Sequence, residues 1–168
     1  MESIQLNIWA VFYAAVAIQG LVVTGILFTT GKGNPRANKY LALLLLGFSC
    51  TRVQSFFSIA GLNEFLPHAI FAATPFWYVL APLYFLYVKT LLDQPARANL
   101  RTLSHFLPFV AVVIFLLPFY ALPAETKYLF WSQSFSGEVG LRRFLFALLY
   151  DLQNLVYLTA SLALVAQT

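Results

Sequence analysis

Two residues of opposite charge, Arg52 and Asp151, lie inside long apolar stretches of the sequence. A charged side chain at membrane depth is costly, so both are candidates for a structural or functional role. Counting about 1.5 Å of rise per residue, Arg52 lies roughly 20 Å beyond Lys39, and Asp151 about 12 to 15 Å beyond Arg143. Measured from opposite faces of a core about 30 Å thick, these depths nearly coincide. We therefore predict that Arg52 and Asp151 meet, either as a structural ion pair or as a ligand or proton site.

Two uncharged polar residues would extend this intramembrane network. Asn154 follows Asp151 by three positions and therefore shares its face if the stretch is helical. Gln19 stands near the middle of the first apolar stretch. With so few polar groups, a continuous polar pathway of the kind that a transporter needs is not expected.

The composition places these residues in an integral membrane protein. Hydrophobic residues make up 61% of the 168 residues, charged residues make up 10%, and the mean hydropathy is +0.78. A soluble domain has about 25% charged residues. Only helices and closed barrels span a bilayer, and the apolar stretches have the length of helices. We therefore predict an all-α, polytopic protein with one integral membrane domain over residues 1–168.

About five membrane spans are expected, separated by polar or proline-containing segments. They lie near residues 8–30, 40–60, 68–92, 103–122 and 144–166. The third carries Pro75 and Pro82, so we expect a proline-kinked helix, which a bilayer tolerates when neighbouring groups satisfy the freed carbonyls. The aromatic and polar residues between 124 and 140 indicate a segment at the membrane interface.

The cations of the connecting segments predict the orientation. The first and third connections hold six cations, and the second and fourth hold three. By the positive-inside rule, the N-terminus is outside and the C-terminus inside, as in a multi-pass protein of a bacterial inner membrane. Arg142 and Arg143 then face outward, where they would meet lipid headgroup phosphates.

The aromatic residues of the third span suggest a pocket. Trp77, Tyr78, Tyr84 and Tyr87 cover two faces of a helix that Pro82 would bend. Such rings would bound a cavity for a lipid-like or aromatic signal, or would serve as packing and interface anchors. The bend at Pro82 would relay an event in the membrane to the cytoplasmic end.

Other reactive residue types give no catalytic pattern. His68 and His105 begin different spans and, in this topology, lie at opposite membrane faces, so they cannot share a metal ion. Ser104 has no carboxylate that would complete a hydrolytic triad with His105. The single cysteine, Cys50, lies in an apolar run and is expected to pack. We expect no enzyme activity, no bound metal and no cofactor.

Several short motifs are similar to those of a known family. They are Asn38-Lys-Tyr-Leu-Ala-Leu-Leu-Leu-Leu46, Leu66-Pro-His68, Ala81-Pro-Leu-Tyr-Phe-Leu-Tyr-Val-Lys-Thr-Leu-Leu92 and His105-Phe-Leu-Pro-Phe109. In order and spacing they resemble the membrane half of AraC-type transcriptional regulators, in which several spans precede a cytoplasmic helix-turn-helix domain. Position 81, usually glycine in that family, is alanine here. The resemblance implies a signal-sensing or anchoring module.

The 168 residues contain no recognition helix and no basic patch beyond the loop cations, so direct binding of nucleic acid is not expected. Either these residues belong with an output domain, or the membrane fold has been reused. In the second case the protein would be a non-catalytic accessory subunit of a respiratory or photosynthetic complex, in contact with lipid, pigment or quinone. The expected partners are membrane lipids and either a cytoplasmic domain of its own or another protein.

Overall fold

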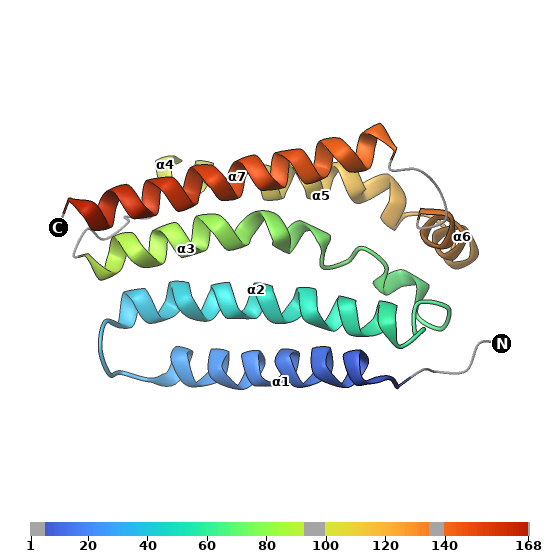
Figure 1. The fold of residues 1–168 in the computed structure, drawn as a ribbon, viewed down its shortest axis with the longest axis horizontal. Coiled ribbons are helices and arrows are strands. Elements are labelled where there is room, and N and C mark those ends of the chain that lie inside the picture. Colours follow the sequence, from blue (N-terminus) through green and yellow to red (C-terminus); the bar gives the residue numbers. More distant parts are fainter. Residues whose placement is uncertain (1–5, 93–99, 135–139, 168) are drawn as a thin grey trace.

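The computed structural model describes residues 6–92, 100–134 and 140–167, and within these ranges the chain is helical without strands. Long helices lie side by side and α6 turns across one end (Figure 1). The α-helices are α1 (Ile8–Thr29), α2 (Pro35–Ile59), α3 (Trp77–Leu91), α4 (Leu100–Ser104), α5 (Leu107–Tyr120), α6 (Ala124–Ser134) and α7 (Leu141–Ala166). Two short 3₁₀ helices, η1 (Pro67–Ala69) and η2 (Thr74–Phe76), precede α3.

Four segments of the described chain are long and apolar enough to cross a membrane. They are Ile8–Thr29, Pro35–Ile59, Pro67–Leu91 and Phe144–Ala166. A fifth is obtained if α5 and α6, which meet at a bend of 118°, count as one broken span. The predicted all-α chain with about five spans is confirmed to this extent.

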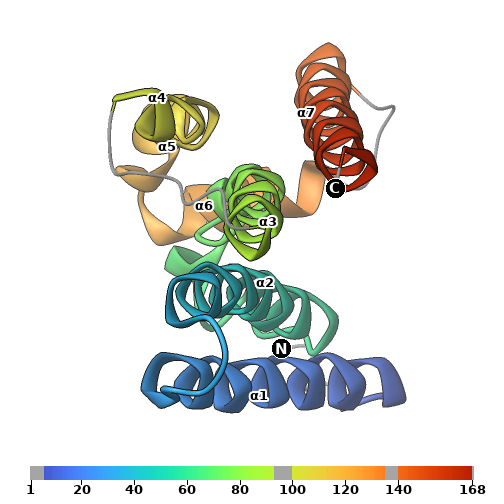
Figure 2. The same cartoon turned by 90° about the vertical axis from the view of Figure 1, so that its left-hand side faces the viewer.

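The third helix, α3, is the centre of the arrangement. It packs against α2 on one side and against α5 and α7 on the other, and these two helices stand apart above it in Figure 2. Its buried residues are Tyr78, Ala81, Pro82, Leu83, Leu86, Val88 and Thr90. The outer helices α1 and α7 expose many large apolar side chains, as lipid-facing helices do.

Small residues allow α1 and α2 to approach closely. A side chain at Gly20 would collide with Ser49 of α2, and the Thr24 hydroxyl donates to the Gly20 carbonyl of its own helix at 2.8 Å. Close contact at small residues is the usual way in which membrane helices associate without a hydrophobic driving force. This pair therefore forms one layer, onto which α3 packs.

The second helix begins five residues earlier than the sequence predicts. Pro35 occupies its first turn, and the Asn34 side chain accepts from the backbone N–H groups of Arg36 and Ala37, both at 3.1 Å. Proline lacks the N–H that would be unpaired there, and asparagine is a favourable N-cap. Pro35 therefore starts the helix and does not extend the preceding loop.

The third predicted span, 68–92, is interrupted. Regular α-helix starts only at Trp77, and between η1 and η2 the chain makes a turn in which Phe71 has a φ of 59°. Pro75 lies in η2, and Pro82 lies within α3. The departure from helical backbone is thus on the N-terminal side of Pro75, and a kink at Pro82 stays a prediction.

The fourth predicted span, 103–122, is shorter than expected, because α5 begins at Leu107. At about 1.5 Å per residue, its 14 residues cover roughly 21 Å, less than the hydrocarbon core. After Pro123, α6 turns away, with Glu125 in its first turn, where an acidic side chain favours the helix dipole. The turn brings α6 beside η1.

Candidate ligand-binding site

Arg52 is surrounded by aromatic rings. Its guanidinium carbon lies 4.9 Å from the ring centroid of Phe48, 5.2 Å from that of Trp77 and 5.5 Å from that of Tyr13. Rings at these distances attract a cation through their negative faces, more strongly where water is excluded. Three helices, α1, α2 and α3, therefore share the stabilisation of this charge.

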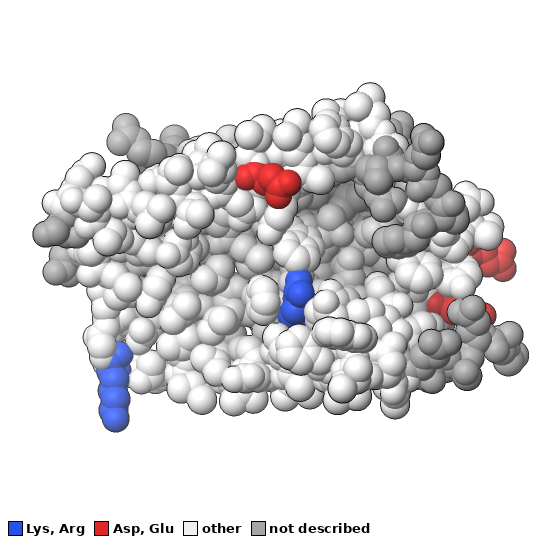
Figure 3. Space-filling model, in the orientation of Figure 1, with Lys and Arg blue, Asp and Glu red and all other residues white. Residues whose placement is uncertain are grey.

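The predicted contact between Arg52 and Asp151 is not formed in the structure. Asp151 is exposed on α7, and α3 lies between α2 and α7, with Trp77 within reach of both Arg52 and Tyr150. Figure 3 shows acidic and basic groups on one face, separated by uncharged surface. The depth count placed the two residues at similar levels, but it carries no information about the direction in which each side chain points.

The predicted polar network is also not formed. Gln19 is exposed on α1, and Asn154 bonds within its own helix, to the Tyr150 carbonyl at 2.7 Å. Two other amide side chains make the contacts between segments instead. Gln54 accepts from the Ala73 N–H at 2.7 Å, and Gln153 donates to the Tyr78 carbonyl at 2.7 Å.

The aromatic residues proposed for a pocket are mainly packing residues. Tyr78 is buried and donates to the Phe146 carbonyl of α7 at 2.8 Å, and Trp77 meets Tyr150 edge-on. Pro82 is buried, Tyr87 is half-buried and Tyr84 is exposed. None of the five residues predicted there lines the cavity described next.

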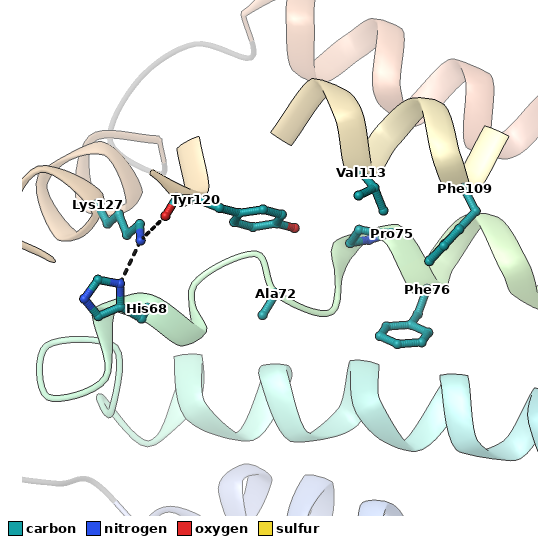
Figure 4. A pocket seen from close by; sticks show the side chains of 8 residues that line it. All are labelled: His68, Ala72, Pro75, Phe76, Phe109, Val113, Tyr120 and Lys127. Atoms are coloured by element: carbon teal, nitrogen blue, oxygen red, sulfur yellow. Dashed lines mark hydrogen bonds between the residues drawn. The ribbon is translucent and has the colours of Figure 1, made fainter. Parts of the chain in front are cut away.

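A cavity of about 380 Å³ lies beside the interruption before α3. Figure 4 shows η1, the turn and η2 along one side, with α5 and α6 on the other. The lining residues are His68, Ala72, Pro75, Phe76, Phe109, Val113, Tyr120 and Lys127. The volume falls at the lower end of the range for small-molecule sites, about 300 to 1,000 Å³.

Lys127 gives this cavity its polar end. Only 2% of the residue is exposed, and its Nζ lies 2.8 Å from His68 Nδ1 and 2.8 Å from the Tyr120 carbonyl oxygen. An ammonium group can only donate, so Nδ1 accepts and the imidazole proton is on Nε2. Among the described residues, no carboxylate pairs with Lys127.

The turn that forms one side of the cavity is held by side chains from other helices. Phe71 adopts left-handed backbone, which is unfavourable for a bulky residue and persists only where its surroundings hold it. Its carbonyl accepts from the Tyr120 hydroxyl at 3.0 Å, and its ring contacts Phe119 and Phe130. Non-helical backbone at membrane depth is tolerated where protein buries it or where it lines a cavity.

A second histidine cluster lies near the other end of the molecule. His105 Nδ1 lies 2.8 Å from the Tyr157 hydroxyl, and both rings contact Phe85, over which the Lys89 ammonium sits at 6.0 Å. Burial lowers the pKa of His105, and the nearby Lys89 cation lowers it further. None of the residues that line the cavity belongs to this cluster. Its rings pack against one another.

Some predicted positions give no further information. The side chains of Arg142 and Arg143 lie outside the described part of the structure, so their lipid contact stays a prediction.

Over residues 6–92, 100–134 and 140–167, no group of three metal-ligating side chains is close enough to hold a metal ion.

Sequence reasoning missed the pairing of His68 with Lys127. The sequence predicts only that His68 begins a span at one membrane face and that Lys127 is one of three cations in the second and fourth connections. Their contact depends on the bend between α5 and α6, for which the sequence offers only Pro118 and Pro123 as signals. Proline indicates where a helix ends, but not the direction in which the next one leaves.

Comparison with known proteins adds no relative. No family model, no curated protein and no solved structure matches this chain.

Proposed function

We propose that this chain is a membrane-embedded signal-receiving module, of the kind that the resemblance to AraC-type regulators implies. The observation that carries the proposal is the cavity beside the interrupted third span. An all-helical membrane chain has no packing need for a turn with a left-handed phenylalanine and a buried lysine. Both features stand beside one cavity, as expected of a site that binds a ligand.

A route from the cavity to the rest of the molecule is continuous in the structure. η2 lines the cavity through Pro75 and Phe76, and α3 follows directly. The hydrogen bonds of Tyr78 with Phe146 and of Gln153 with Tyr78 join α3 to α7. A change at the turn would therefore shift α3 and α7 together, with Pro82 as the proposed flexible point.

The proposed setting is a bacterial inner membrane with the N-terminus outside and the C-terminus inside. The cation count supports this orientation, and α1 begins at the end of the molecule opposite to that where α7 finishes (Figure 1). The cavity then lies toward the outer face. Its partners would be lipids and a cytoplasmic output domain, without direct binding of nucleic acid by these residues.

A reporter fusion tests the proposal. A helix-turn-helix domain fused after residue 168 would drive a reporter gene from its operator in cells. Tyr120→Phe frees the Phe71 carbonyl, and Pro82→Ala stiffens α3, so both should change reporter output at least threefold at equal protein level. Tyr84→Phe, on an exposed ring, is the matched control and should leave output unchanged.

Unchanged output in both test variants would contradict a sensing role. Copurification in mild detergent examines the other hypothesis, an accessory subunit. Constant association with a large energy-converting complex would favour that hypothesis and overturn the sensor.

A further inference from the structure

Lys127 has no carboxylate partner among the residues that the structure describes. The side chain is almost completely buried, and its two hydrogen-bond partners, His68 Nδ1 and the Tyr120 carbonyl, are uncharged acceptors. Burying a cation without a counter-charge is expensive, because neutral acceptors replace only part of its hydration. Within residues 6–92, 100–134 and 140–167, no group supplies an anion to Lys127.

The hydrogen-bonding capacity of this group leads to the same conclusion. An ammonium has three donors, and two are used by the partners above. The third has no acceptor among the described residues. Lys127 is a lining residue of the cavity, so we assign this third bond to an oxygen of a molecule bound there.

The remaining lining is mainly apolar. Pro75, Phe76, Phe109 and Val113 extend from the lysine along η2 and α5 (Figure 4). An anion that is hydrated on all sides would be desolvated against these side chains without compensation. A molecule with one anionic end and an apolar body matches both parts.

We propose that the cavity binds a small anionic amphiphile, whose carboxylate or phosphate meets Lys127 Nζ while its apolar body lies against Phe76, Phe109 and Val113. This inference rests on the proposed sensing function and names the ligand class of the same site. A cavity of about 380 Å³ offers space for one short acyl chain or ring system. A phospholipid would place only its phosphate and the first part of a chain there.

Binding measurements on the full chain in phosphatidylcholine nanodiscs test the proposal. Dodecanoate, dodecyl phosphate and uncharged 1-dodecanol serve as probes, and protein-free discs correct for partition into lipid. The two anions should bind at least tenfold more tightly than the alcohol. Lys127→Gln keeps a donor without the charge, and it should weaken dodecanoate binding at least tenfold while leaving dodecanol unchanged.

Two control variants separate a local effect from loss of fold. Lys127→Arg keeps the cation and should keep the preference for anions. Lys89→Gln removes an ammonium near the other end, outside the cavity, and should not change binding. Equal affinity for the anions and the alcohol, or full dodecanoate binding by folded Lys127→Gln, would overturn the proposal.

A second lipid composition identifies the source of the anion. In discs containing phosphatidylglycerol, a headgroup phosphate at Lys127 would compete with dodecanoate and weaken its binding. If the affinity for dodecanoate is unchanged, the ligand is a free amphiphile and not a lipid headgroup. Both results agree with an anionic group at Lys127. If binding depends on Lys127 but the reporter fusion does not respond, the anion site is supported and the sensing function is overturned. If the reporter responds but the cavity binds the alcohol as tightly as the anions, the sensing function is supported and the proposed ligand class is overturned.

Discussion

The two histidines of this protein lie near opposite ends of the bundle and make hydrogen bonds of equal length in different surroundings. His68 Nδ1 lies 2.8 Å from the Lys127 ammonium beside a cavity. His105 Nδ1 lies 2.8 Å from the Tyr157 hydroxyl, in a cluster closed by Phe85. One end buries a charge beside empty space, and the other fills its space with rings. The comparison supports the proposal that the His68 end binds a ligand and that the His105 end holds helices together.

The largest difference is expected when one ring is removed from each end. Phe85→Ala empties the filled cluster and should lower the free energy of unfolding by about 3 kcal/mol, the lower end of the range for ring truncations that leave a cavity. Phe109 lines a hollow that lipid or water can already enter, so Phe109→Ala should cost less than Phe85→Ala. Reversible unfolding by dodecyl sulfate in mixed micelles measures both. Equal losses would contradict the distinction between the ends.

A smaller effect is expected from the hydroxyl that holds the turn. Tyr120→Phe removes the bond to the Phe71 carbonyl, worth about 1 kcal/mol. Amide hydrogen exchange between residues 70 and 76 should then become roughly fivefold faster, because the turn opens more often. Tyr157→Phe, at the other end, is the matched control and should leave exchange in this segment unchanged. Equal acceleration by both variants would show general loosening.

The smallest effect is a dependence on pH at the filled end. The pKa of His105 is lowered in the folded state, so the unfolded chain binds the proton more readily. Stability should therefore be constant above the ordinary histidine pKa and should fall as the pH drops from there through the lowered value. The midpoint of unfolding between pH 7.5 and 5 measures this loss. His105→Gln should reduce the slope, and an unreduced slope would assign the loss to other groups.

The sequence was sufficient to predict an all-α chain with about four to five candidate spans, because these depend on long apolar runs. Residues 8–30 and 144–166 correspond closely to α1 and α7. It did not predict the break inside the third span, because the turn at Phe71 depends on partners distant in sequence. Tyr120 and Gln54 satisfy the backbone of that turn, and neither pairing leaves a periodic pattern.

The candidate site was not predicted for a related reason. A count along a helix gives the depth of Arg52 and Asp151, whereas contact also depends on rotation and on the helix between them. The same count had no way to join His68 to Lys127, which are 59 positions apart. The aromatic residues of α3 drew attention to its centre, while the cavity begins just before it, at Pro75 and Phe76.

Cysteine labelling in intact cells tests whether the proposed ligand cavity faces outward and the filled end faces inward. In a Cys50→Ala background, Ala72→Cys lines the cavity and Leu103→Cys lies near the other end. A membrane-impermeant maleimide should label position 72 from outside, and dodecanoate, but not dodecanol, should slow that labelling. Position 103 should react only after permeabilisation. Labelling of position 103 from outside, or no protection at position 72 by dodecanoate, would contradict the account.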